Sequence, residues 1–290
     1  MGADVRGRLV MVTAVLVAAV GCGAGGEGGE GDLVIDHDPA ATPYSGPLLL
    51  ATEETDEDTP QALLLASGAA GRALECDGEI SWGGGPDGWS ERDGGDTPEA
   101  GLRLWFDLFE PTGPRSGFRA EREETDRVLY SYDVDGRTKI AVVVARDQKG
   151  RPGWGPETHA TCDPAELPAS VTDSGTPEIW TDRHGERVAT TTLSSYPGAE
   201  HCDWQTAHFL GTGRGAEYRQ YVRDPEGVID EDLLTSPYDG DVTLPADAHD
   251  TGYRHGDRRL WLTDDASTAY VRTSDGVEAW PLAKETVACM

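Results

Sequence analysis

The sequence predicts an α+β fold, in which a small helix-plus-meander domain precedes a mostly β domain. One amphipathic segment, followed by two strand-forming runs joined at Asp135-Gly136, indicates the first domain. Beyond a proline-rich stretch at residues 163–177, short β-rich runs alternate with Gly, Asp and Pro clusters, which is typical of β-structure. Each domain is expected to be closed by one disulfide.

The first 21 residues have the pattern of a secretory signal peptide. Arg6 and Arg8 precede an uncharged run at residues 9–20. This run is shorter than the roughly 20 residues of a membrane span, but it fits the roughly 7–15 of a signal peptide. It ends in Ala-Val-Gly-Cys, which resembles a bacterial lipobox and implies diacylglycerol on Cys22. The alternative is ordinary cleavage near residues 19–21, which leaves Cys22 as a thiol.

Strong acidity marks the whole chain and especially its start. The formal net charge is −29, and residues 22–71 contain ten Asp or Glu and no Lys or Arg. Such a chain is repelled by phosphate backbones and anionic lipid surfaces, so we expect no nucleic-acid partner. Residues 23–32 carry almost no apolar side chains and are predicted to be a flexible tether. Short strands could dock at residues 33–35 and 48–50.

Two segments define the first domain. Residues 60–75 have helical composition, with possible breaks at Gly68 and Gly71. A second helix is predicted from Thr97 to Phe109, where a cap and a proline precede apolar residues at helical spacing. The hairpin then follows, and its apolar run at residues 141–144 indicates a strand buried on both faces.

The second domain is predicted to consist of short strands. Asp275-Gly276 is a further hairpin signal. We expect strands at residues 179–181, 188–194, 260–263, 269–273 and 277–280. The expected divisions are a signal peptide at 1–21, an acidic flexible tether at 22–59, an α+β domain at 60–163, a linker at 164–175 and a mostly β domain at 176–290.

Five cysteines are present, and lipidation of Cys22 leaves an even four for two disulfides. Of three possible pairings, we favour Cys76–Cys162 and Cys202–Cys289, because each stays within one predicted domain. The two pairs are separated by 86 and 87 positions. A remote internal duplication would also explain this spacing, and the alternative is two unrelated domains that are each bracketed by a disulfide.

Seven strings, in this order, carry a resemblance that covers most of residues 73–289. They are ALECDG at 73–78, SYDVDGRTK at 131–139, CDPAELP at 162–168, EHCDWQ at 200–205, YVRDPEGV at 221–228, LPADAHDTGYR at 244–254 and VEAWP at 277–281. The chain resembles exported proteins of unknown function from high-GC Gram-positive bacteria, which are described as lipoproteins. The resemblance implies export and carries no named reaction.

Trp82 and Trp89 are candidate ligand-binding residues, since they lie near carboxylates in the glycine-rich segment SWGGGPDGW. Exposed tryptophans can stack on sugar rings, whereas the alternative is that both fold over the core. His201-Cys202-Asp203 is a poor catalytic dyad, because neighbouring residues of a strand point to opposite faces. The acidic loop residues considered for calcium, for which a solvated loop is favoured, are Asp224, Glu226, Asp230, Glu231 and Asp232.

We therefore predict a lipid-anchored protein on the extracytoplasmic face of the cell membrane, acting as a binding or interaction module of the cell envelope. The expected partner is a neutral glycan or an envelope protein. The sequence contains neither HExxH nor CxxC, and it predicts no catalytic residue, metal or cofactor. The alternatives are an envelope hydrolase that uses carboxylates assembled by the fold, and a structural surface component.

Overall fold

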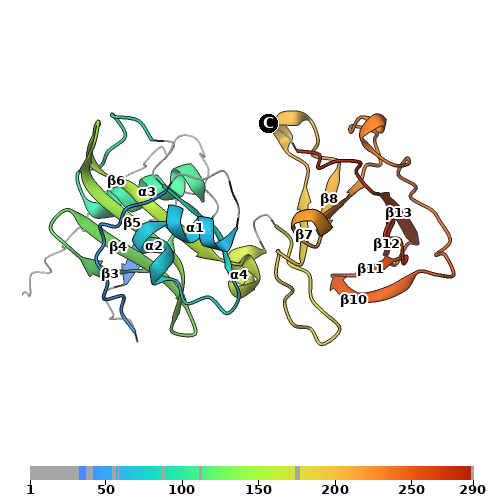
Figure 1. Cartoon of the computed structure of the whole chain (residues 1–290), viewed down its shortest axis with the longest axis horizontal. Helices are drawn as coiled ribbons and strands as arrows, with labels where there is room; N and C mark the ends of the chain where they lie inside the picture. The colour runs from blue at the N-terminus through green and yellow to red at the C-terminus, as the bar shows by residue number, and fades with distance from the viewer. Residues whose placement is uncertain are drawn as a thin grey trace, which may run out of the picture. The chain divides into compact units, whose positions relative to one another are not determined.

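Three β-sheets and a few helices make up the part of the chain that the computed structural model describes (Figure 1). That part comprises residues 33–36, 42–53, 57, 59–85, 89–110, 113–173 and 177–288. The predicted α+β class is confirmed. The signal segment, Cys22 and Cys289 lie outside the described residues. Within the described ranges, no helix is long and apolar enough to cross a membrane.

The first half of the described chain forms a six-stranded sheet. In spatial order its strands are β1 (Val34–Asp36), β3 (Ser116–Glu123), β4 (Arg127–Val134), β5 (Arg137–Gln148), β6 (Arg151–Cys162) and β2 (Ile80–Gly84). β1 runs parallel to β3, and the other neighbours are antiparallel. Between β4 and β5, Asp135 and Gly136 have φ values of 53° and 77°. Positive φ at both positions is what a two-residue hairpin requires, so that prediction is confirmed.

One face of this sheet is covered by α3 (Pro98–Phe109), the helix that the sequence predicts. Thr97 caps it, because its hydroxyl accepts a hydrogen bond of 3.2 Å from the backbone N–H of Ala100. Its apolar stripe packs against side chains of β3, β4, β5 and β6. The fully buried residues of the stripe are Leu102, Trp105 and Phe106.

The opposite face of the sheet is covered by α2 (Gly68–Ala73), and α1 (Pro60–Ala66) packs beside α2 and β2. Gly68 separates the two helices with a φ of 52°, whereas Gly71 lies within α2 and does not break it. The alanines of α2 pack on Ala141 and Val143 of β5. Since α3 packs on the other side chains of β5, this strand is buried on both faces, as its apolar run predicts.

The second half of the chain forms two antiparallel sheets, which share one core containing Trp180, Tyr221 and Trp280. The three-stranded sheet contains β7 (Leu193–Pro197), β8 (His208–Thr212) and β9 (Arg219–Arg223), and the four-stranded sheet contains β10 (His249–His255), β11 (Arg258–Leu262), β12 (Thr268–Arg272) and β13 (Val277–Pro281). A separate cluster that includes Phe209 and Val287 packs on the other face of the three-stranded sheet. The 3-10 helices of this half are η2 (Glu200–Cys202), η3 (Gly215–Glu217) and η4 (Glu231–Leu233).

The strand predictions for this half are confirmed in part. The runs at residues 260–263, 269–273 and 277–280 fall on β11, β12 and β13. The runs at 179–181 and 188–194 are wrong for most of their length, because β7 begins only at Leu193. The backbone N–H of Thr190 donates to the Asp163 carboxylate at 3.0 Å and is therefore not available to a strand ladder.

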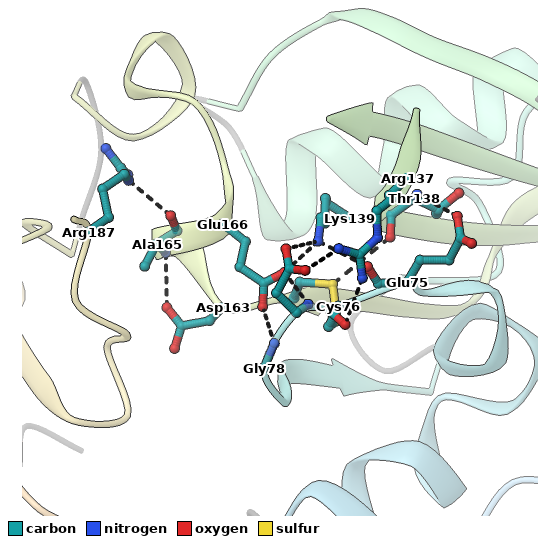
Figure 2. Close-up of polar contacts among 12 residues, drawn as sticks. Glu75, Cys76, Gly78, Arg137, Thr138, Lys139, Asp163, Ala165, Glu166 and Arg187 are labelled. Carbon is teal, nitrogen blue, oxygen red and sulfur yellow. Dashed lines mark hydrogen bonds and ion pairs between the residues drawn. A yellow bond between two sulfur atoms is a disulfide. The ribbon is translucent and has the colours of Figure 1, made fainter. Parts of the chain in front are cut away.

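The segment predicted to be a linker is tied to the second half of the chain. It contains η1 (Pro164–Glu166) and α4 (Ala169–Thr172). Arg187 donates to the carbonyl oxygen of Ala165 at 3.0 Å, a contact that Figure 2 shows. Residues Leu33–Met290 form one compact unit, and its division into two domains stays a prediction.

Candidate functional site

A mostly apolar cavity of about 580 Å³ lies in the second half of the chain. Its walls come from the end of β7, the loop that follows, β8 and the segment before the C-terminus. None of its lining side chains is charged. We call this cavity the aromatic pocket, and its lining residues are Pro177, Tyr196, Pro197, Gly198, Ala199, Trp204, Phe209, Thr286, Val287 and Ala288.

Trp204 reaches the aromatic pocket because the chain folds back on itself between β7 and β8. Gly198 is needed at this fold, since a Cβ atom there would lie 2.1 Å from the carbonyl oxygen of Trp204. The ring of Trp204 lies 5.9 Å from that of Phe209, on which Tyr196 stacks at 5.6 Å. Tyr196 and Trp204 are both partly exposed, so the cavity offers aromatic surface to a ligand.

A buried glutamine joins the two walls of the aromatic pocket. Gln220 accepts a hydrogen bond of 2.7 Å from the backbone N–H of Val287 and donates to the carbonyl oxygen of the same residue at 3.1 Å. It also donates to the hydroxyl of Tyr196 at 3.1 Å. The position of the C-terminal wall therefore depends on one amide that is only 3% exposed.

Ser195, His208 and Glu178 form a polar cluster beside a second cavity, of about 440 Å³, which His208 helps to line. Ser195 Oγ donates to Glu178 Oε2 at 2.7 Å and lies 2.9 Å from His208 Nε2. Arg258 donates to the same carboxylate at 2.7 Å. Burial raises the pKa of Glu178, but hydrogen bonds from His208 and Arg258 outweigh burial and hold this pKa well below its usual range.

This cluster does not have the arrangement of a nucleophilic triad. In a triad, the serine and the carboxylate contact different nitrogens of the histidine. Here Ser195 and Glu178 both lie near His208 Nε2, at 2.9 Å and 3.2 Å. Ser195 is also fully buried, so its hydroxyl is not accessible to a substrate. We interpret the cluster as a polar contact that ties β7, β8 and β11 together.

The hydrolase alternative depends on the carboxylates that line a cavity, and it stays a prediction. Such an enzyme needs a carboxyl group with a raised pKa in a cleft. Among the described residues, burial raises the pKa of Glu110, but Glu110 lines neither cavity. Glu278 does line the second cavity. Burial raises its pKa, but hydrogen bonds from Arg223 and Trp280 lower the pKa by more than burial raises it. The net effect lowers the pKa of Glu278, which is opposite to the shift that a general acid needs.

A partly buried polar cluster surrounds the disulfide between Cys76 and Cys162, which confirms one predicted pairing (Figure 2). Lys139 is 2% exposed, and its Nζ donates to the carboxylates of Asp77 at 2.9 Å and Glu166 at 2.6 Å. Glu166 also accepts backbone N–H bonds from the residues that follow Cys76. The ion pairs therefore fix the turn after the disulfide.

This cluster is not a metal centre. Cys76, Cys162 and Glu166 place potential ligand atoms within 4.8 Å of one another. Both sulfur atoms are joined in the disulfide, however, and a cysteine ligand must be a free thiolate. The carboxylate of Glu166 is already bonded to Lys139. The arrangement is structural.

The two tryptophans of the glycine-rich segment lie in different surroundings. Trp89 is 3% exposed, and its indole N–H donates to the carbonyl oxygen of Pro156 at 3.2 Å. Trp82 is partly buried in β2, and its ring centroid lies 4.2 Å from that of His159. Trp89 thus has no open face for a sugar ring, as expected if it folds over the core. Ligand binding by Trp82 and Trp89 together stays a prediction.

The remaining candidates have structural roles. Cys202 is disulfide-bonded, so it is not a thiol nucleophile. Its expected partner, Cys289, lies outside the described residues, and that pairing stays a prediction. In the acidic loop, Asp224 is buried and accepts backbone N–H bonds from Val228 and Ile229. Asp230 caps η4 in the same way. The carboxylates of Asp224 and Asp230 therefore stabilise the backbone of the loop.

Sequence reasoning missed the aromatic pocket. Tyr196, Trp204 and Phe209 have no periodic pattern, since one lies in each of β7, the loop and β8. The position of Trp204 two residues after Cys202 was an available signal, because a disulfide holds nearby side chains in place. Comparisons with protein-family models, curated proteins and solved structures find no match. The site is therefore argued from the residues themselves.

Proposed function

We propose that this chain is a lipid-anchored binding module on the extracytoplasmic face of the cell membrane, and that the aromatic pocket holds its ligand. The observation that carries the proposal is the pocket itself. It is an uncharged cavity of about 580 Å³ with the partly exposed rings of Tyr196 and Trp204 in its wall. Concave, mainly apolar cavities of roughly 300–1,000 Å³ are the usual form of ligand sites.

Several features support the location. The apolar run before Cys22 has the length of a signal peptide, and the lipobox-like end supplies a membrane anchor. The disulfide between Cys76 and Cys162 is typical of exported proteins. The resemblance to exported lipoproteins of high-GC Gram-positive bacteria points the same way.

The finer architecture that we propose is two domains, each closed by its own disulfide. Cys76–Cys162 joins the chain before β2 to the end of β6, which are both parts of the six-stranded sheet region. Cys202 is disulfide-bonded, and Ala199 and Ala288 line the same cavity. The chain that leads to Cys289 thus lies beside η2, which carries Cys202. This proximity supports the pairing Cys202–Cys289.

The ligand that fits best is a neutral glycan of the envelope. An uncharged lining offers no ion pair to a charged ligand, whereas an aromatic face can pack on the apolar face of a sugar. An envelope protein that inserts an apolar side chain is the other partner considered. In both cases the binding surface is the ring pair of Tyr196 and Trp204.

Binding to purified cell-wall polysaccharide tests the proposal. We expect Trp204→Ala to lose retention on the polysaccharide while its melting temperature stays close to that of the wild type. Trp82→Ala is the matched comparison, because it also removes a tryptophan side chain but one that lies outside the pocket. This variant should retain binding. Loss of binding in Trp82→Ala alone would contradict the pocket assignment and favour the glycine-rich segment. Retention by both variants would contradict binding through tryptophan at either place.

A further inference from the structure

Three arginines lie directly opposite one another on adjacent strands of the four-stranded sheet. Arg254 on β10 is paired with Arg259 on β11, and Arg259 is paired with Arg272 on β12. Directly paired residues project from the same face of a sheet. Neighbouring strands are roughly 4.8 Å apart, so the three side chains start from a row of evenly spaced positions. We call these residues the arginine row.

The arginine row is on the face that points away from the core. Side chains alternate along a strand, and the residue after Arg259, Leu260, is fully buried in the core between the two sheets. Val271, which precedes Arg272, is buried in the same core. Arg259 and Arg272 are accordingly exposed, and Arg254 is partly exposed. Arg259 and Arg272 therefore face solvent, whereas Nε of Arg254 is buried and has no hydrogen-bond partner among the described residues.

An aromatic pair lies in the next row of this face. Trp261 on β11 is directly opposite Tyr270 on β12, and Tyr270 is directly opposite Ala279 on β13. Trp261 and Tyr270 are both partly exposed. Asp250 of β10 lies opposite Trp261, and it accepts a hydrogen bond of 2.8 Å from the backbone N–H of Gly252. The face thus combines a cationic row with an aromatic row.

A fourth arginine extends the cationic area. A Cβ atom at Gly252 would lie 3.3 Å from Nε of Arg183, so the side chain of Arg183 crosses β10 at this glycine. Gly252 has a φ of 86°, which together with this contact explains why a larger residue does not fit. Arg183 is exposed. The absence of a side chain at Gly252 leaves room for it beside the arginine row.

Ion pairs within the protein do not explain why three arginines lie opposite one another in the arginine row. Among the described residues, none of Arg254, Arg259 and Arg272 forms an ion pair with a carboxylate, although Arg223 and Arg258 in the same half each do. Like charges directly opposite in a sheet are destabilising. The arrangement therefore costs stability and gains no internal partner, in a chain with 53 Asp and Glu residues. This is the pattern of a surface whose partner is an external anion.

The acidity of the whole chain does not prevent such binding. At physiological salt, charges are screened over about 8 Å, so exposed carboxylates beyond that distance contribute little at the row. The guanidinium groups act at contact, where their forked N–H donors match a carboxylate or phosphate. The formal charge of −29 thus excludes non-specific attraction of polyanions but not a local cationic site.

We propose that the arginine row and the Trp261–Tyr270 pair bind an acidic polysaccharide. A row of regularly spaced cations suits a polymer with repeated negative charges better than a single small ion. The aromatic row provides a stacking surface for sugar rings, which a phosphate headgroup does not use in this way. None of the residues in either row lines the cavities described above, so this open sheet face is a second surface, distinct from the aromatic pocket.

The test is binding of the full chain to polygalacturonate, with dextran as the neutral comparison. The double variant Arg259→Gln/Arg272→Gln removes two exposed arginines of the row. Its matched control is Arg103→Gln/Arg219→Gln, which removes two exposed arginines elsewhere and gives the same net charge. We expect the first variant to weaken binding to polygalacturonate by about tenfold or more, because it removes two guanidinium groups whose forked N–H donors match a carboxylate. The control variant should bind as the wild type does.

Three outcomes would overturn the proposal. Equal losses in both double variants would show a response to net charge only. Unchanged binding in Trp261→Ala, with binding lost in the arginine variant, would show a surface for any polyanion rather than for a glycan. Binding to phosphatidylglycerol vesicles without binding to polygalacturonate would assign the face to the membrane. Loss of binding in both Arg259→Gln/Arg272→Gln and Trp261→Ala, with both proteins folded, would support the proposal.

Discussion

The side chain of Gln220 holds the backbone of Val287 through both its N–H and its carbonyl group, at 2.7 Å and 3.1 Å. Gln220 is the second residue of β9, and Val287 lies in the segment that closes the aromatic pocket. This pairing replaces the strand ladder that a longer C-terminal strand would supply. It also explains why a polar residue occupies a position that is only 3% exposed.

Gln220→Ala should therefore destabilise the protein and open the pocket. It leaves the buried N–H of Val287 without a partner, which costs about 1–3 kcal/mol. Urea unfolding measures the free energy, and binding to cell-wall polysaccharide measures the pocket. Gln205→Ala, which changes an exposed glutamine of the loop between β7 and β8, should leave both unchanged. Wild-type stability in Gln220→Ala would show that the amide clamp is not formed.

His159 should make stability fall as the solution becomes acidic. Burial lowers its pKa to about 4, because the ring is packed between Trp82 and Phe109 and its Nδ1 has no hydrogen-bond partner among the described residues. In the unfolded chain the pKa is about 6.5. Between these two values the unfolded state binds the proton and the folded state does not. Stability contributed by neutral His159 is thus complete above about pH 6.5 and decreases as the pH falls toward 4.

The size of this effect is up to about 3 kcal/mol, since one pKa unit corresponds to 1.36 kcal/mol. Chemical unfolding at pH 7 and at pH 4.5 measures it, and the informative quantity is the difference between the wild type and His159→Phe. The phenylalanine variant should lose less stability than the wild type over this range, because carboxylates contribute equally to both. Identical pH profiles would show that His159 titrates as an exposed histidine does.

Lys139→Met should be strongly destabilising, by about 3 kcal/mol or more, because Glu166 then keeps a partly buried charge without its cation. Adding Glu166→Gln should recover part of the loss, since the amide is neutral and its single oxygen can still accept one of the two backbone N–H bonds that Glu166 accepts from Asp77 and Gly78. Thermal unfolding of both single variants and the double variant measures this coupling. Additive losses would mean that Lys139 and Glu166 do not interact.

Local patterns predicted the helices and hairpins of the first half well. At Thr97 a cap, a proline and an apolar stripe agree, and the helix starts where they place it. At Asp135-Gly136 the turn residues match the φ values that the hairpin requires. In both cases the determining interactions lie within a few residues, so the sequence alone contains them.

Long-range contacts explain what the sequence could not supply. The run at residues 188–194 has strand composition, but the backbone N–H of Thr190 donates a hydrogen bond to the carboxylate of Asp163, which lies 27 residues away in the sequence. The rings of Tyr196 and Trp204 both contact Phe209, and Gly198 allows the chain to fold back between them. The arginine row is equally invisible along the chain, because Arg259 and Arg272 become neighbours only through strand register.

Peptide mapping without reduction should link Cys202 to Cys289 in protein recovered from membranes. Cys76 and Cys162 are bonded to each other and Cys202 is disulfide-bonded, so within one chain the remaining partners for Cys202 are Cys22 and Cys289. Lipidation uses the sulfur of Cys22, which makes the two predictions interdependent. If Cys22 carries diacylglycerol, intact mass shows a mature chain that begins at Cys22 and contains two disulfides. A Cys22–Cys202 peptide would contradict both the lipid anchor and the disulfide that closes the second domain.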